Sequence, residues 1–193
     1  LKIVVIFILG TFFMRSAGCV VNDFADKKYD KDVTRTQNRP LASGTLKSRP
    51  AVWVFLTLIS CSFLLVSQTN KLTVTLAVIG VFLASTYPYA KRFTYLPQIH
   101  LGIAFGWAIP MSFAAQISAL PSECWTIFIV TIIWAVIYDT EYAMVDRDDD
   151  LKIGVKSTAI LFGEDDRLII GLLQILMIFG LFMVGNVASL HWQ

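Results

Sequence analysis

The sequence predicts an all-α protein, a multi-pass transmembrane helical bundle, and three observations support this. Hydrophobic residues make up 56% of the 193 residues and charged residues only 16%, whereas ordinary soluble domains carry about 25% charged residues. The charges gather in a few segments and leave long apolar runs between them. The runs at 55–66 and 168–184 offer almost no polar stripe of the kind that a soluble helix turns toward water. A soluble helical protein with an unusually apolar core is the disfavoured alternative.

Six stretches are apolar over roughly the 20 residues that a helix needs to cross a bilayer. In chain order they lie near 1–20, 51–69, 72–90, 98–119, 124–145 and 167–190. The first runs into a charged motif, short turns follow the second and fourth, and charged connections follow the third and fifth. Pro88 and Pro110 fall inside spans and predict kinked helices, whose freed backbone groups need neighbouring helices or a cavity. This favours a bundle around a central cavity.

The charged residues predict an orientation in the membrane. Strict alternation of the six spans puts thirteen Lys and Arg residues on one face and leaves Lys2 and Lys71 on the other. The positive-inside rule makes the crowded face cytoplasmic. Thirteen of the fourteen Asp and Glu residues lie in or beside the same segments, and only Glu123 does not. Because acidic residues contribute little to orientation, their position on one side indicates chemistry at that face.

The first acidic motif, Asn22-Asp23-x-x-Asp26-x-x-x-Asp30, stands where the first span meets the cytoplasm. If the helix continues, Asn22, Asp26 and Asp30 share one face at a spacing of four residues. Like charges at this spacing repel, and a bound cation would remove the penalty. Oxygen ligands of this kind suit magnesium, which commonly binds one or two carboxylates together with substrate phosphates.

The second motif, Asp139-x6-Asp146-x-Asp148-Asp149-Asp150, ends the fifth span. On a continuous helix Asp139, Asp146 and Asp150 fall within about 40° of one another. A run of charges after an apolar helix is usually only a solvated face. Two such motifs on the same side of the membrane instead favour a binding site. Together they would hold two magnesium ions around a diphosphate and assist its departure as a leaving group.

Basic residues near these motifs would complete a diphosphate site. The candidates are Arg39, Lys91, Arg92 and Lys152, and each of them could equally serve only to set the topology. The scattered residues Cys19, Cys61 and Cys124 form no C-x-x-C pair, which argues against a disulfide framework or a zinc site.

Three strings resemble the UbiA superfamily of intramembrane prenyltransferases. They are Arg15-Ser-Ala-Gly-Cys-Val-Val-Asn-Asp-Phe-Ala-Asp26 with Asn38-Arg39-Pro40-Leu41, Tyr87-x-x-x-Lys91, and Tyr138-Asp-Thr-Glu-Tyr-Ala-Met-Val-Asp-Arg-Asp-Asp-Asp150 with Gly154 and Ser157-Thr158. Gly106-Trp-Ala-Ile-Pro-Met111 and Lys156-Ser-Thr-Ala-Ile-Leu-Phe-Gly163 are similar to the bacterial 4-hydroxybenzoate polyprenyltransferases of the ubiquinone pathway. The resemblance covers essentially the whole chain.

The resemblance implies a polyprenyl diphosphate donor, two magnesium ions and prenylation of 4-hydroxybenzoate at the carbon ortho to its hydroxyl. It implies a multi-pass protein of the bacterial inner membrane whose partners are these substrates and the lipid bilayer, with no nucleic acid. Carried over by position, it implies the following roles: Asn22, Asp26, Asp146 and Asp150 as metal ligands, Asp23, Asp30 and Asp149 in support, Tyr87, Lys91, Arg39 and Arg92 at the substrate and diphosphate, and Asp139 as the group that orients or deprotonates the acceptor.

The chain departs from this family in its extent. Members usually have nine membrane helices, and the sequence predicts six in a single domain over 1–193 that is incomplete at both ends. Two alternatives stay open from the residues. A sister prenyltransferase with another aromatic acceptor would share both acidic motifs. A cation channel or transporter would use acidic residues deep inside its spans, whereas here the carboxylates stand at one end.

Overall fold

The computed structural model describes residues 1–188, and within that range every regular element is a helix. Five helical stretches are long and apolar enough to cross a membrane: Lys2–Asp26, Ser48–Val66, Lys71–Ala90, Ser122–Val145 and Thr158–Val187. They confirm the all-α membrane bundle and correspond to five of the six predicted spans, with ends that differ by up to nine residues. The last predicted span also included residues 189 and 190, which lie outside the described residues.

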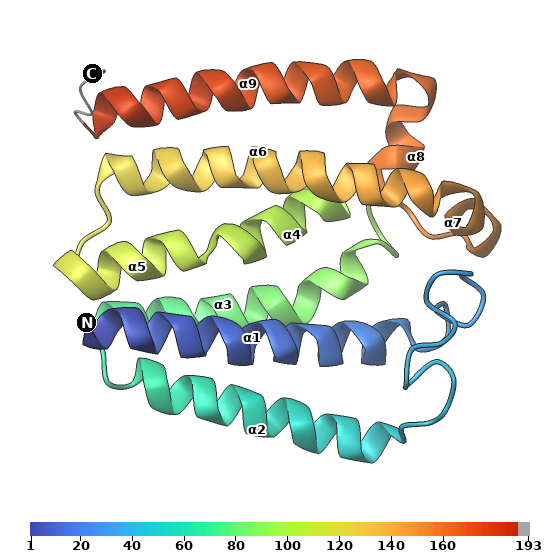
Figure 1. Ribbon diagram of the computed structural model, residues 1–193, viewed down its shortest axis with the longest axis horizontal. Coiled ribbons are helices and arrows are strands. Elements are labelled where there is room, and N and C mark those ends of the chain that lie inside the picture. Colours follow the sequence, from blue (N-terminus) through green and yellow to red (C-terminus); the bar gives the residue numbers. More distant parts are fainter. Residues whose placement is uncertain (189–193) are drawn as a thin grey trace.

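The N-terminal half is a group of three long helices, α1 (Lys2–Asp26), α2 (Ser48–Val66) and α3 (Lys71–Ala90). Helix α1 packs against both α2 and α3, as Figure 1 shows. Asn70 caps α3, because its side chain accepts a hydrogen bond from the Thr73 backbone N–H at 2.9 Å. The connection 27–47 between α1 and α2 contains no helix and is a series of turns.

The predicted span 98–119 is divided into two short helices, α4 (Pro97–Gly106) and α5 (Ala108–Ile117), with Trp107 between them. Pro110 explains the break, since its nitrogen cannot donate to the Gly106 carbonyl and its ring would collide with that group in a continuous helix. At Gly102 a Cβ atom would lie 3.1 Å from the Ile132 backbone oxygen. The glycine therefore lets α4 approach α6 closely.

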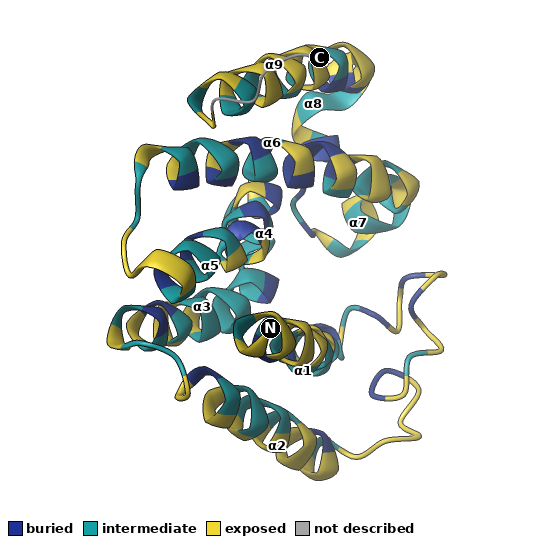
Figure 2. Cartoon of the chain, turned by 60° about the vertical axis from the view of Figure 1, so that its left-hand side comes forward, coloured by how far each residue is buried: buried dark blue, intermediate teal, exposed yellow. Residues whose placement is uncertain are grey.

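The C-terminal half consists of α6 (Ser122–Val145), α7 (Arg147–Ile153), α8 (Thr158–Phe162), a single 3₁₀ turn η1 (Gly163–Asp165) and α9 (Asp166–Val187). Helix α6 packs between α4 and α9. Large apolar side chains are exposed along α2 and α9, which suits contact with lipid or with further apolar helices (Figure 2).

The long charged connections meet at one end of the bundle. The turns after α1, the link between α3 and α4, and α7 with its flanking loops all lie at the right of Figure 1. The short turns after α2 and α5 lie at the opposite end. The fold therefore brings both acidic motifs to the same end, as the alternation of spans predicts.

Candidate active site

The first acidic motif occupies the last turn of α1, which ends at Asp26. The expected continuation of this helix through Asp30 is wrong, because the chain leaves the helix in a turn after Asp26. Asp30 stays close to the helix end, since its backbone N–H donates to the Asp26 carbonyl at 2.9 Å. Asn22 lies one helical turn before Asp26 and shares its face of α1.

Asp26 is the most deeply placed carboxylate of this motif, with only 1% of its surface exposed. Lys91 Nζ, at the end of α3, lies 2.5 Å from Asp26 Oδ2. The other oxygen, Asp26 Oδ1, is buried and has no hydrogen-bond partner within residues 1–188. A buried carboxylate oxygen without a partner is unfavourable unless a hydrogen-bond donor or a cation binds it.

A single arginine joins the other two carboxylates of the first motif. Arg39 Nη1 lies 3.1 Å from Asp23 Oδ1 and 3.1 Å from Asp30 Oδ2. Thr36 Oγ1 donates to the Asp30 carbonyl at 3.2 Å and fixes the turn that carries these groups. The connection 27–47 thus folds back over the end of α1.

The second motif lies across a break between two helices. Helix α6 ends at Val145, Asp146 adopts a non-helical conformation, and α7 begins at Arg147. The expectation that Asp139, Asp146 and Asp150 share one continuous helix is therefore wrong. Gly154 ends α7 in the left-handed conformation (φ 73°) and its N–H donates to the Asp150 carbonyl, which is a common helix stop.

Arg35 reaches from the 27–47 connection to the second motif. Its Nε lies 3.1 Å from Asp146 Oδ1 and its Nη2 lies 2.5 Å from Asp146 Oδ2, a two-pronged ion pair. The neighbouring Thr34 donates from both its backbone N–H and its hydroxyl to Asp149 Oδ2. Two adjacent residues therefore fasten the connection to α7.

The remaining carboxylates of α7 differ in their surroundings. Hydrogen bonds from Lys152 and from the Thr34 backbone hold the pKa of Asp149 below its ordinary value. Burial, and then the neighbouring charge of Asp146, raise the pKa of Asp150 to about 6. Asp150 forms no ion pair with Lys or Arg within residues 1–188, so its carboxylate is open to a cation.

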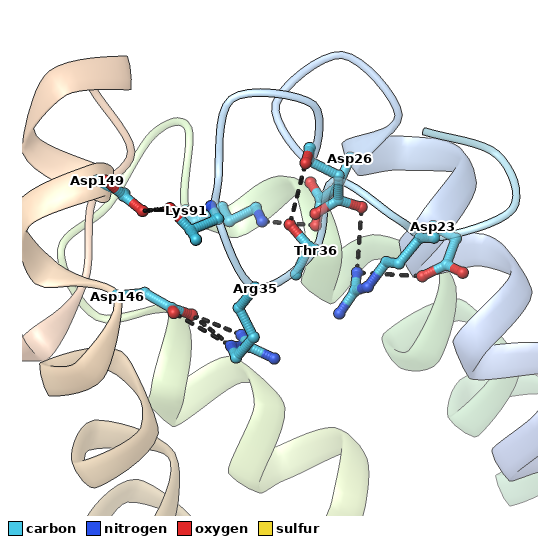
Figure 3. Close-up of polar contacts among 10 residues, drawn as sticks. Asp23, Asp26, Arg35, Thr36, Lys91, Asp146 and Asp149 are labelled. Carbon is cyan, nitrogen blue, oxygen red and sulfur yellow. Dashed lines mark hydrogen bonds and ion pairs between the residues drawn. The ribbon is translucent and has the colours of Figure 1, made fainter. Parts of the chain in front are cut away.

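Lys91 and Arg35 stand between the two motifs, as Figure 3 shows. Lys91 pairs with Asp26 and also interacts electrostatically with Asp150. Arg35 pairs with Asp146 and interacts with Asp30 and Asp150. The structure thus brings both motifs to one end of the bundle, with Lys91, Arg35 and Arg39 paired to their carboxylates.

The other predicted site residues lie around this centre. Asp139 stands on α6 within the electrostatic reach of Lys91 and Arg35, and Tyr87 on α3 interacts with Asp139 and Asp26. Arg92 is engaged elsewhere, because it donates to the Ala25 carbonyl at 2.6 Å and its guanidinium lies over the rings of Tyr29 and Tyr89. It secures the end of α1 against α3.

Sequence reasoning missed four residues that the structure places at or beside this site. They are Thr34, Arg35, Gln98 and Arg15. Arg15 had a visible signal, since a guanidinium inside an apolar span is costly and is usually functional. It interacts electrostatically with the phenols of both Tyr87 and Tyr138. The other three lacked a local signal, because the partners that position them are distant in the sequence: their hydrogen bonds to Asp149, Asp146 and Thr158 span 60 to 115 residues.

The donor set fits magnesium. Within residues 1–188 no three Asp, Glu, His or Cys side chains are gathered around one point, because Lys91, Arg35 and Arg39 separate the carboxylates. The open positions are nevertheless oxygen atoms, including the buried and unpartnered Asp26 Oδ1. Magnesium prefers oxygen ligands and takes part of its coordination from substrate phosphates.

A hollow of about 460 Å³ lies between α1 and α5, at the end opposite the carboxylates. Its lining is mostly apolar and consists of Ile3, Val4, Phe7, Ile8, Thr11, Ser112 and Gln116. The carboxylate cluster and this hollow therefore lie at opposite ends of the bundle.

Comparisons with known proteins agree on the family. A model of the UbiA prenyltransferase family matches residues 1–193. The 4-hydroxybenzoate octaprenyltransferases of Aliivibrio fischeri (strain MJ11) and Pasteurella multocida (strain Pm70) are each 55% identical to this chain, over 97% and 99% of it and 66% of their own length. The chain thus spans just under two thirds of the length of these curated relatives.

Solved structures share the fold. A UbiA homolog from Aeropyrum pernix K1 superimposes with a TM-score of 0.86 at 26% identity, covering 100% of this chain and 73% of that one. A UbiA homolog from Archaeoglobus fulgidus, solved bound to GPP and Mg²⁺, gives a TM-score of 0.76 at 19% identity, over 97% of this chain and 67% of the other.

Proposed function

This chain belongs to the UbiA prenyltransferase family, and we propose that the complete protein prenylates 4-hydroxybenzoate. A polyprenyl diphosphate would donate its chain to the ring carbon ortho to the hydroxyl, with release of diphosphate, in ubiquinone biosynthesis. The observation that carries the proposal is the meeting of two acidic motifs around Lys91 and Arg35 at one end of an apolar bundle. The relatives with 55% identity support the choice of acceptor.

The carboxylates would hold the metal and the donor. Asn22 and Asp26 from the first motif, and Asp146 and Asp150 from the second, are the proposed ligands of two magnesium ions. Asp23, Asp30 and Asp149 would support them. When bound, magnesium would neutralise the diphosphate and stabilise its charge as it leaves.

The cations of the site would bind the donor. Lys91 and Arg39 would contact the diphosphate oxygens, because both already lie among the carboxylates that bind the metal. Arg92 and Lys152 would add positive charge from nearby. The C–O bond of the donor breaks, and its electron pair leaves on the diphosphate.

The acceptor would lie deeper in the bundle, between α1, α3 and α6. Asp139 would orient the phenol and take its proton while the new C–C bond forms at the ortho carbon. The proton of that carbon would then pass to the departing diphosphate, and Asp139 would return its proton to the ring oxygen. Tyr87, together with the stacked Trp134 and Tyr138 rings (centroids 5.5 Å apart), offers aromatic faces to the positive charge on the prenyl carbon. The apolar hollow beyond them would take the distal prenyl chain.

Arg15 would bind the acceptor carboxylate. It lies eleven residues before Asp26 on α1, about 16 Å deeper along the helix, and it interacts with the phenols of Tyr87 and Tyr138. We expect Arg15→Gln to raise the KM for 4-hydroxybenzoate about 10-fold to 100-fold and to leave donor binding unchanged. Steady-state kinetics against each substrate measure this. A weaker affinity for the donor alone would contradict the assignment.

The reaction itself is tested with the complete protein in bacterial membranes. Labelled 4-hydroxybenzoate, a polyprenyl diphosphate and magnesium should yield a lipid-soluble labelled product, and chelator should prevent its formation. Competing unlabelled aromatic acceptors separate this function from that of a sister prenyltransferase. No transfer to 4-hydroxybenzoate, with transfer to another acceptor, would overturn the proposed substrate.

The proposed location is the bacterial inner membrane, with the site facing the cytoplasm. Ser43 lies exposed in the 27–47 connection, so a cysteine placed there reports the side of the membrane. In a background without native cysteines, Ser43→Cys should react with impermeant thiol reagents only in inside-out vesicles. Labelling of intact cells from the periplasm would reverse the proposed topology.

A further inference from the structure

Gln98 is a polar side chain in the second position of α4, and only 3% of its surface is exposed. Burying an amide costs free energy unless both its carbonyl and its NH₂ group find partners. The Gln98 carbonyl accepts the backbone N–H of Thr158 at 3.1 Å. The Gln98 side chain also interacts with the Asp139 carboxylate. One amide therefore links α4 to the start of α8 and interacts with the last third of α6.

The partners on either side of Gln98 are themselves fixed. Thr158 begins α8, which Ser157 caps through a hydrogen bond to the Ile160 backbone N–H. The hydroxyls of Thr158 and Thr140 lie 2.6 Å apart, and both residues are fully buried. Thr140 directly follows Asp139 on α6. The segment after the second acidic motif is thus anchored beside Asp139.

These contacts determine how the amide must be oriented. Since the Thr158 N–H needs an acceptor, the Gln98 carbonyl faces α8, and the NH₂ group is left to donate to Asp139. The opposite orientation would set a carbonyl against a carboxylate and an NH₂ group against an N–H. Gln98 therefore gives Asp139 a fixed hydrogen-bond donor on the side of α4. Lys91 and Arg35 interact electrostatically with Asp139 from the end of the bundle where the acidic motifs lie.

We infer that Gln98 is a positioning residue, which holds the Asp139 carboxylate in the orientation that receives the acceptor phenol. The inference deepens the proposed function and rests on it. A hydrogen bond to a charged group is worth about 10-fold to 100-fold in an equilibrium or a rate. The loss should fall on acceptor binding and turnover, because the partners of Gln98 within residues 1–188 are Thr158 and Asp139, and neither is a proposed metal ligand.

Gln98→Met is the test, since methionine keeps the size and removes both hydrogen bonds. In the complete protein we expect kcat/KM for 4-hydroxybenzoate to fall about 10-fold to 100-fold. Calorimetry with magnesium and a non-hydrolysable prenyl diphosphate analogue should show donor affinity within about threefold of the parent. Gln68→Met, in the exposed turn between α2 and α3 at the opposite end of the bundle, is the control and should leave both quantities unchanged.

A double-mutant cycle separates positioning from general packing. If Gln98 acts through Asp139, Gln98→Met should add almost nothing in a chain that already carries Asp139→Asn. Additive losses, or equal losses of donor and acceptor binding, would refute the positioning role. Gln98→Asn provides a second variant, because the shorter amide cannot reach both partners, and it should show the same loss of acceptor affinity in smaller degree.

The outcomes also separate this inference from the proposed function. A parent that prenylates 4-hydroxybenzoate but gives an additive cycle refutes only the role of Gln98. A parent that prenylates another aromatic acceptor refutes the proposed substrate, and the cycle is then run with that acceptor. A parent without transfer to any acceptor refutes both.

Discussion

Asp26→Asn is expected to abolish turnover of the complete protein, lowering kcat by about 10³-fold or more. The substitution keeps the size of the side chain but removes the negative charge that binds metal. Asp26 is the carboxylate with the strongest structural case, since it is almost fully buried, pairs with Lys91 and has an oxygen without a partner. Turnover with a fixed polyprenyl diphosphate and saturating magnesium measures the loss.

The matched control for this change is Asp32→Asn. Asp32 belongs to the same acidic stretch but is exposed and outside the cluster of ion pairs, so its loss should change kcat less than about twofold. Detergent extraction and size-exclusion profiles should show that both variants insert and fold. Near-normal activity of a well-folded Asp26→Asn protein would remove Asp26 from the metal site.

Lys91→Met should have the second largest effect, a loss of donor affinity of about 10²-fold or more. The ammonium group interacts with carboxylates of both motifs, and the proposed function gives it the diphosphate as a partner. Binding of a non-hydrolysable donor analogue in the presence of magnesium is the direct measurement.

An exposed lysine of the same acidic end supplies the control for Lys91. Lys28→Met removes an equal charge from the connection after α1, and it should lower donor affinity only slightly because salt screens exposed charges. Equal losses in the two variants would mean that Lys91 acts only through the net charge of this end. In that case its proposed contact with the diphosphate would be withdrawn.

Most of the long helices were predictable because an apolar run of sufficient length has few other folds available to it. The predicted spans 72–90 and 124–145 match α3 and α6 closely. For 98–119 the sequence predicted a kink from Pro110 but not the complete break at Trp107, because hydropathy averaged over a window does not register the hydrogen bond that the proline removes. The separation of α7 from α6 was not predicted, because the second acidic motif was expected on one continuous helix. The helix α8 was missed because its five residues are far shorter than a membrane span.

The candidate site was predictable in its carboxylates but not in their partners. Spacing along a helix can place Asp26 one turn after Asn22, yet it cannot show that Arg35 pairs with Asp146, which lies 111 residues away. Both acidic motifs also extend past the end of a helix. Asp30 therefore does not share a helical face with Asp26, and Asp150 does not share one with Asp139. Tertiary contacts through the 27–47 connection replace the shared face.

At this end of the bundle, Arg and Lys side chains occupy the positions beside the carboxylates that metal ions would take. If the carboxylates bound magnesium, Arg35 and Lys91 would release them but stay at this end of the bundle, so metal binding would add positive charge there. The displaced groups would then need anions, and the diphosphate provides them. Once Arg35 leaves Asp146, the hydrogen bonds of Thr34 to Asp149 would be those that remain, within residues 1–188, between the 27–47 connection and α7. Metal binding, donor binding and release of the 27–47 connection would thus be coupled in one equilibrium.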